Sequence, residues 1–148
     1  MAQKAFDNHL GIKGWAIGGS WGIERYLYTL HRITGLGILL YFLMHIFVTS
    51  ARVFGSDFWN ILLGENGFLH HTVFVIGEYL VYVAFCFHAL NGIRLVMIEL
   101  GFLVGKPIEP VYPYKTCLHL QRPLTMLFMV VSAFLIVVGG YDLFIVGK

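Results

Sequence analysis

Three long apolar runs separate the polar clusters of this chain. They extend from about residue 29 to 51, from about 72 to 100 and from about 124 to 146. A helix crosses the ~30 Å hydrocarbon layer of a membrane with about 20 mostly apolar residues, and each run reaches that length. The pattern predicts an all-α integral membrane protein with three transmembrane helices in a single domain, residues 1–148.

Composition agrees with this prediction. The chain has 148 residues, of which 58% are hydrophobic and 12% are charged, whereas soluble domains carry about 25% charged residues. Few residues remain outside the three runs, so no soluble domain is predicted. Any chemistry in the aqueous phase must therefore come from partner subunits, and we expect the lipid bilayer, not nucleic acid, around this chain.

The Lys and Arg residues predict the orientation of the helices. Eight of the ten lie in or beside the N-terminal segment 1–28 and the connection between the second and third runs. Cytoplasmic connections carry an excess of Lys and Arg, so we expect the N-terminus in the cytoplasm and the C-terminus outside. Segment 1–28 holds no uninterrupted apolar stretch and is predicted to lie at the cytoplasmic interface, not to be a cleavable signal. Three prolines predict an extended connection at 101–123.

Two histidines lie inside the apolar runs, His45 in the first and His88 in the second. An ionisable side chain in hydrocarbon is costly and indicates a functional site, although an interhelical hydrogen bond is the ordinary alternative. Gly35 lies beside the helical stripe of His45, and Gly92 follows His88 by one turn. Small residues leave room for a flat ligand, so two such histidines on separate helices favour a cofactor.

His45 and His88 are not expected to hold one iron together. If Arg32 and Arg94 mark the inner membrane edge, His45 lies about 20 Å deep and His88 about 9 Å deep, at 1.5 Å per residue. Two imidazoles on one metal must each lie within about 2 Å of it, which an offset of about 10 Å forbids. If both histidines bind haem, the chain holds one half of each of two sites.

A basic pair, His31-Arg32, opens the first run. It either marks the membrane edge or forms a polar site at the headgroup boundary. A quinone carbonyl needs hydrogen-bond donors and a haem propionate needs cations, and the planar, permanently charged Arg side chain supplies both. On the second helix, Arg94 projects about 120° from the stripe of His88, so it can serve the same ligand only by reaching around the helix.

Two motifs resemble signatures of a known family. The sequence LHRITG at residues 30–35 resembles the Leu-His-Arg, aliphatic, Ser/Thr, Gly signature of the cytochrome b subunit of succinate dehydrogenase. The sequence HALNGIR at 88–94, followed by MIELG at 97–101, resembles the second signature of that subunit, in which His is followed by Gly-Ile-Arg and an acidic residue. Both motifs fall at the expected ends of the first two helices, and the resemblance covers roughly residues 25–146.

The resemblance implies a membrane anchor of succinate:quinone oxidoreductase, or complex II, an enzyme of the tricarboxylic acid cycle. Such an anchor is half of a six-helix haem-binding bundle, completed by a second three-helix anchor subunit. The two dock an iron–sulfur subunit and a flavoprotein subunit on the cytoplasmic face of a bacterial or archaeal membrane, or on the mitochondrial inner membrane. This chain would then carry electrons to quinone and form part of the quinone site, but not the succinate site.

The resemblance also implies haem ligands. His88 matches the axial iron ligand of the haem b nearer the cytoplasmic face. Single-haem members lack a histidine at the position of His45, so its presence resembles the two-haem branch. We therefore expect two haem b groups, each shared with the partner anchor subunit, and at least one.

The remaining implied contacts are to quinone or to haem propionates. They involve Arg32, with His31 close by, and Arg94 at the end of the second motif. Many members place Ser three residues before the motif histidine, where it helps to bind quinone. Here Tyr28, followed by Thr29, stands at that position, and a tyrosine hydroxyl can donate the same hydrogen bond.

Two other functions stay open at this point. The chain could be an assembly anchor that binds quinone but holds one haem or none. It could also be the cytochrome b anchor of another respiratory enzyme, such as a formate dehydrogenase or a hydrogenase, although the pair of motifs argues against this. The direction of catalysis, succinate oxidation or fumarate reduction, depends on the soluble subunits and the quinone.

Overall fold

A computed structural model describes residues 11–16, 23–106 and 120–147 of the chain. Most of segment 1–28 and of the proline-containing connection lies outside the described residues. The described elements are α1 (Gly11–Ala16), α2 (Ile23–Ser50), η2 (Ala51–Phe54), α3 (Ser56–Leu63), η3 (Phe68–His70), α4 (Thr72–Glu99), α5 (Arg122–Tyr141) and η5 (Asp142–Val146).

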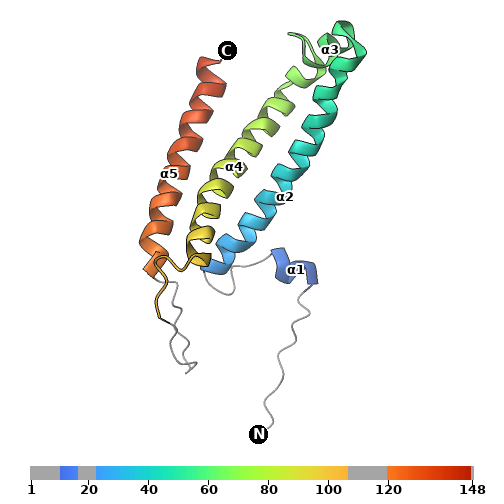
Figure 1. The fold of residues 1–148 in the computed structure, drawn as a ribbon. Helices are drawn as coiled ribbons and strands as arrows, with labels where there is room; N and C mark the ends of the chain where they lie inside the picture. The colour runs from blue at the N-terminus through green and yellow to red at the C-terminus, as the bar shows by residue number, and fades with distance from the viewer. Residues whose placement is uncertain (1–10, 17–22, 107–119, 148) are drawn as a thin grey trace.

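The three long helices α2, α4 and α5 run in alternating directions along one axis (Figure 1). Each is long and apolar enough to cross a membrane, over Ile23–Phe54, Thr72–Glu99 and Arg122–Val146. The prediction of an all-α protein with three spans is confirmed. We call the end of the bundle that holds Ile23, Glu99 and Arg122 the basic end, and the opposite end, capped by α3, the α3 end.

Helix α2 begins at Ile23, six residues before the expected start at residue 29. The added turns hold Glu24 and Arg25, which are good helix formers. The polar stretch that precedes the apolar run therefore belongs to the same helix. Because α2 begins at Ile23, the residues Tyr28, His31 and Arg32 all lie on regular helix.

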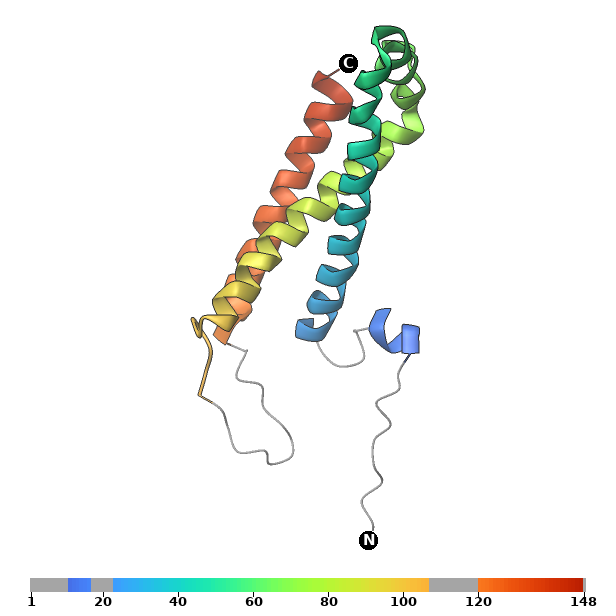
Figure 2. The same ribbon diagram turned by 45° about the vertical axis from the view of Figure 1, so that its right-hand side comes forward.

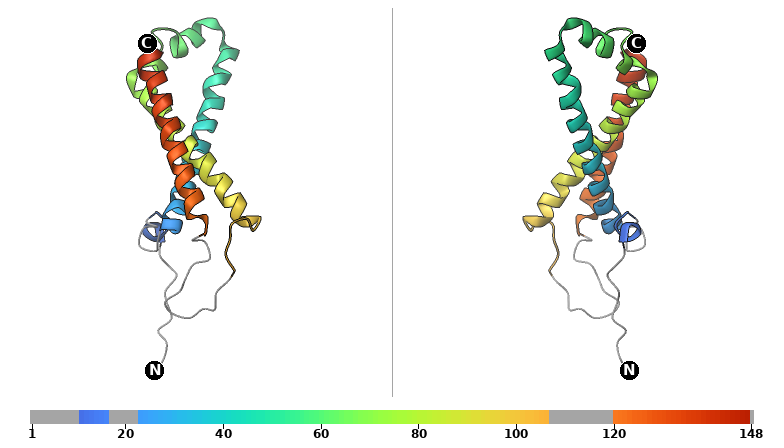
Figure 3. Two further views of the ribbon diagram at one scale, coloured as in Figure 1. Left: turned by 90° about the vertical axis from the view of Figure 1, so that its left-hand side faces the viewer. Right: turned by 90° about the vertical axis from the view of Figure 1, so that its right-hand side faces the viewer.

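Helix α4 is the central helix and packs against both α2 and α5. Figure 3 shows α2 and α4 crossing and then separating toward α3, and Figure 2 shows α5 beside α4 at the basic end. The α4–α5 contact is tied by two tyrosines, because the Tyr79 hydroxyl donates to the Ile136 carbonyl at 3.0 Å and the Tyr82 hydroxyl to the Leu135 carbonyl at 2.9 Å. Such interhelical hydrogen bonds help to hold helices together where the hydrophobic effect does not.

Most apolar side chains of the three spans remain uncovered by the chain itself. Leu36 is 55% exposed, Ile46 62% and Val137 68%, whereas only a few side chains at the helix crossings are buried. A soluble monomer rarely exposes so much continuous apolar surface. This surface is suited to contact lipid or other membrane subunits.

Candidate functional site

The two motif histidines meet where α2 and α4 cross. The imidazole rings of His31 and His88 are stacked, with centroids 3.8 Å apart and planes 8° from parallel. Both side chains are half-buried. The two sequence motifs thus form a single structural unit at the crossing.

Backbone and side-chain oxygens of α2 orient the ring of His88. Its Nδ1 lies 3.1 Å from the carbonyl oxygen of His31 and 3.4 Å from Oγ1 of Thr34. The Thr34 hydroxyl itself lies within donating distance of the carbonyls of Leu30 and His31, at 2.9 and 3.0 Å. A carbonyl oxygen can only accept, so this geometry favours the tautomer of His88 with the proton on Nδ1. Nε2 then carries the lone pair that can bind a metal.

Two glycines make this close crossing possible. A Cβ at Gly35 would lie 2.8 Å from Cε1 of His88, and a Cβ at Gly92 would lie 3.3 Å from Cε1 of His31. On each helix, the motif glycine therefore packs against the motif histidine of the other helix. Gly37 also lies on α2, but a Cβ added there would meet open space, so Gly37 has no such role.

His31 has an unsatisfied ring nitrogen. Its Nδ1 is buried and has no hydrogen-bond partner in the part of the chain that the structure describes. Buried polar atoms are nearly always paired, so an unpaired one indicates a missing neighbour such as a ligand, a water molecule or another subunit.

Tyr28 and Arg32 form a separate pair on α2. The Arg32 guanidinium donates to the Tyr28 hydroxyl at 2.6 Å and lies over its ring, 4.3 Å from the centroid. Both side chains are exposed, and Arg32 points about 100° away from His31 around the helix. The pair therefore faces outward from the edge of the α2–α4 contact.

Thr29 and Arg94 do not join either group. Thr29 is 6% exposed and lies about 160° from His31 around α2. Arg94 is 2% exposed, and its Nε donates to Oδ1 of Asn91 at 2.9 Å. The contacts expected of Tyr28, Thr29, His31, Arg32 and Arg94 therefore do not converge on one ligand position within this chain.

Asn91 is a site residue that the sequence analysis missed. Its side chain is 0% exposed, accepts from Arg94 and donates from Nδ2 to the Leu27 carbonyl at 3.5 Å. It thereby joins α4 to the backbone of α2, one turn from the stacked histidines. The available signal was an amide in the middle of an apolar run, directly before the motif glycine.

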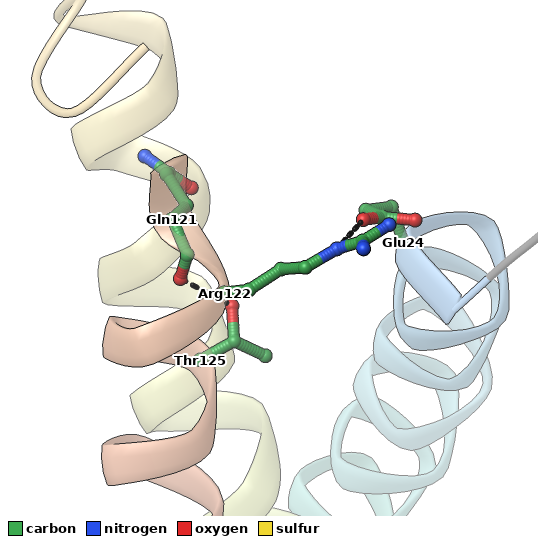
Figure 4. A network of polar contacts seen from close by, with 4 residues as sticks. All are labelled: Glu24, Gln121, Arg122 and Thr125. Carbon is green, nitrogen blue, oxygen red and sulfur yellow. Dashed lines mark hydrogen bonds and ion pairs between the residues drawn. The ribbon is translucent and has the colours of Figure 1, made fainter. Parts of the chain in front are cut away.

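An ion pair joins the first and third spans at the basic end. Nε of Arg122 donates to Oε1 of Glu24 at 3.0 Å, as Figure 4 shows. Arg94 lines the same cavity of about 150 Å³ as this pair. Next to it, Nε2 of Gln121 donates to the Phe102 carbonyl at 2.9 Å, which fixes the end of α4 against the start of α5.

His45 stands apart from this cluster. It is exposed on α2, and its ring centroid lies 5.8 Å from that of Tyr41. Its ring nitrogens make no hydrogen bond to any described residue. Gly35, the α2 neighbour of His88, precedes His45 by ten residues, or about 15 Å along the axis, so the two candidate ligands lie at different depths.

The chain was compared with family models, with curated proteins and with solved structures. The succinate dehydrogenase/fumarate reductase transmembrane subunit family matches residues 3–139. The search of the curated proteins found no match, and the search of the solved structures found none either. The family match spans both motif helices and most of the third helix, which confirms the resemblance carried by the motifs. The chain therefore belongs to the family of succinate dehydrogenase/fumarate reductase transmembrane subunits.

Proposed function

We propose that this anchor subunit carries electrons from an iron–sulfur subunit to quinone and holds haem b together with a second anchor subunit. The observation that carries the proposal is the hydrogen bond geometry of His88, whose Nδ1 lies 3.1 Å from the His31 carbonyl. That bond leaves Nε2 as the coordinating atom. Haem b, when bound, supplies a one-electron carrier between the clusters and quinone.

The residues present fit a haem with one ligand from this chain. Histidines that bind metals usually donate their second ring nitrogen to a carbonyl or carboxylate, which fixes the ring and raises its basicity. His88 has such a carbonyl, and a stacked neighbour in His31 that restricts rotation of its ring. The other histidine of the crossing, His31, lies parallel to His88 at 3.8 Å and cannot bind the opposite side of the same iron. A second iron ligand would therefore come from the partner subunit.

Tyr28 and Arg32 are proposed to contact quinone. Their exposed polar groups lie near the basic end, where an amphipathic quinone headgroup can leave the hydrocarbon. Arg32 directs a terminal nitrogen to Tyr28, and its remaining N–H groups can donate to a quinone carbonyl or a propionate. Thr29 and Arg94 are assigned a supporting role, since both are buried.

His45 is proposed as the ligand of a second haem. Its side chain is exposed, and its ring nitrogens make no hydrogen bond to a described residue. The 15 Å spacing along the helix fits two haems in series better than one shared iron. Two haems would place the chain in the two-haem branch of the family.

The orientation proposed is the one that the Lys and Arg residues predict. The basic end faces the cytoplasm, and the iron–sulfur and flavoprotein subunits dock there. Quinone would then bind at Tyr28 and Arg32, within one turn of His31 on α2.

Substitution of Arg32 tests the quinone role. In the purified complex, Arg32→Ala is expected to lower quinone reduction about tenfold or more, because a donor to the carbonyl is lost, while succinate oxidation with an artificial acceptor stays intact. The matched control is Arg52→Ala, which removes a guanidinium that stacks on Trp59 at the α3 end. Equal loss of both activities in Arg32→Ala would refute a local quinone role.

Substitution of His45 tests the haem count. Haem quantification and reduced-minus-oxidised spectra of the complex are expected to lose one of two haems in His45→Ala. An unchanged stoichiometry would refute the two-haem proposal and leave the single-haem anchor.

A further inference from the structure

An acidic side chain lies within the second span, ten residues before His88 and its stacked partner His31. Glu78 is the seventh residue of α4, about 9 Å from the start of the helix at the α3 end. It is exposed, and it makes no hydrogen bond or ion pair with any described residue. A carboxylate at such depth is costly in hydrocarbon and normally faces a partner group.

Glu78 lines a groove between the diverging halves of α2 and α4. The groove has a volume of about 220 Å³ and presents apolar side chains together with Glu78, Tyr41 and Tyr82. The Tyr82 hydroxyl already donates to the Leu135 carbonyl. The Tyr41 hydroxyl makes no hydrogen bond to a described residue. Two uncommitted polar groups, one on each helix, therefore face the same space.

This chain does not supply the missing partner. No Lys or Arg lies between Arg52 and Arg94 or between Arg122 and Lys148. Arg52 sits at the α3 end, where its guanidinium stacks on Trp59, 4.4 Å from the ring centroid. A second copy in the same orientation would place no Lys or Arg at the depth of Glu78. It would place His45 there, five residues before the end of α2, and that side chain is already assigned to a haem.

We propose that this groove receives a transmembrane helix of the second anchor subunit, through a cationic side chain that pairs with Glu78. The inference rests on the proposed function for the existence of that subunit. It adds the position and chemistry of the contact. Charge complementarity argues for this occupant, because lipid chains offer no donor and a second copy offers no Lys or Arg at this depth. The Tyr41 hydroxyl would complete the hydrogen bonds of the pair.

Substitution of Glu78 tests the proposal, through the amount of second anchor subunit that co-purifies with this chain. In the full complex, Glu78→Leu is expected to reduce co-purification of the second anchor subunit about tenfold or more, because it leaves the partner's buried cation unpaired. Glu78→Gln is expected to lose less, since an amide oxygen still accepts. The control is Glu65→Leu, in an exposed turn at the α3 end. If Glu78 faces lipid, Glu78→Leu will instead leave co-purification unchanged or improve it, and the proposal is then wrong.

Cross-linking identifies the occupant directly. A benzoyl-phenylalanine in place of Tyr41 should capture a peptide of the second anchor subunit that contains Lys or Arg, and one in place of Leu39, about 160° around the helix, should not. Capture of lipid alone, or of a second copy of this chain, would overturn the proposal. Both readouts are independent of haem and quinone. A complex that fails in quinone reduction but keeps this cross-link would therefore refute the proposed function and not the groove.

Discussion

The imidazole of His88 occupies the space into which a side chain on Gly35 would project. A Cβ at Gly35 would lie 2.8 Å from Cε1 and 3.3 Å from Nδ1 of the ring. The close approach of His88, in the second motif, therefore explains why the first motif has a glycine at position 35. This contact brings the ring close enough to α2 to reach the His31 carbonyl.

Replacement of Gly35 by alanine should displace the His88 ring. The added methyl group overlaps Cε1, and the ring must move away from its hydrogen bond to His31. We expect a loss of stability of about 1–3 kcal/mol, as for other overpacked sites, together with loss of haem from the complex. Thermal unfolding and haem absorbance measure the two effects.

Alanine substitutions at three other glycines provide a comparison for the effect expected at Gly35. Gly92→Ala should have a smaller effect, because its Cβ would lie 3.3 Å from Cε1 of His31. Gly37→Ala and Gly77→Ala are matched controls, since a Cβ at either position meets open space. Equal effects at Gly35 and Gly37 would mean that the close helix crossing does not exist in the membrane.

Asn91→Leu should destabilise the α2–α4 contact. The substitution removes the acceptor of Arg94 Nε and the donor to the Leu27 carbonyl, both at a fully buried position. An unsatisfied buried group costs about 1–3 kcal/mol. Thermal unfolding of the complex should show this loss, whereas Asn60→Leu, at an exposed position on α3, should be nearly neutral. A neutral Asn91→Leu would show that Asn91 does not join the helices.

The Glu24–Arg122 ion pair should contribute little to stability. Arg122 is 57% exposed and Glu24 22% exposed, and exposed pairs contribute about 0.2–1 kcal/mol. A double-mutant cycle with Glu24→Gln and Arg122→Gln should give a coupling in this range that falls as salt screens the charges. A coupling that is larger and independent of salt would indicate that another subunit buries the pair.

The amino-acid sequence predicts the three spans well, because apolar length is a property of single helices. The assignment of His45 and His88 as haem ligands stays a prediction. The 100° rotation per residue also predicts that Arg94 turns away from His88. The stacking of His31 on His88 was not predictable in this way, because it depends on the register in which α2 and α4 cross. The hydrogen bond from Asn91 to the Leu27 carbonyl was missed for the same reason, since it depends on how the two helices pack.

The most direct test of the account is the haem content of the purified complex that carries His88→Ala. The account predicts the loss of one haem b per complex, with the subunits still assembled and succinate oxidation by an artificial acceptor retained. It also predicts partial recovery of the haem spectrum in His88→Gly when free imidazole is added, because the ligand enters the vacated space. A His88→Ala complex with unchanged haem content and spectrum would contradict the central claim that His88 is an axial ligand.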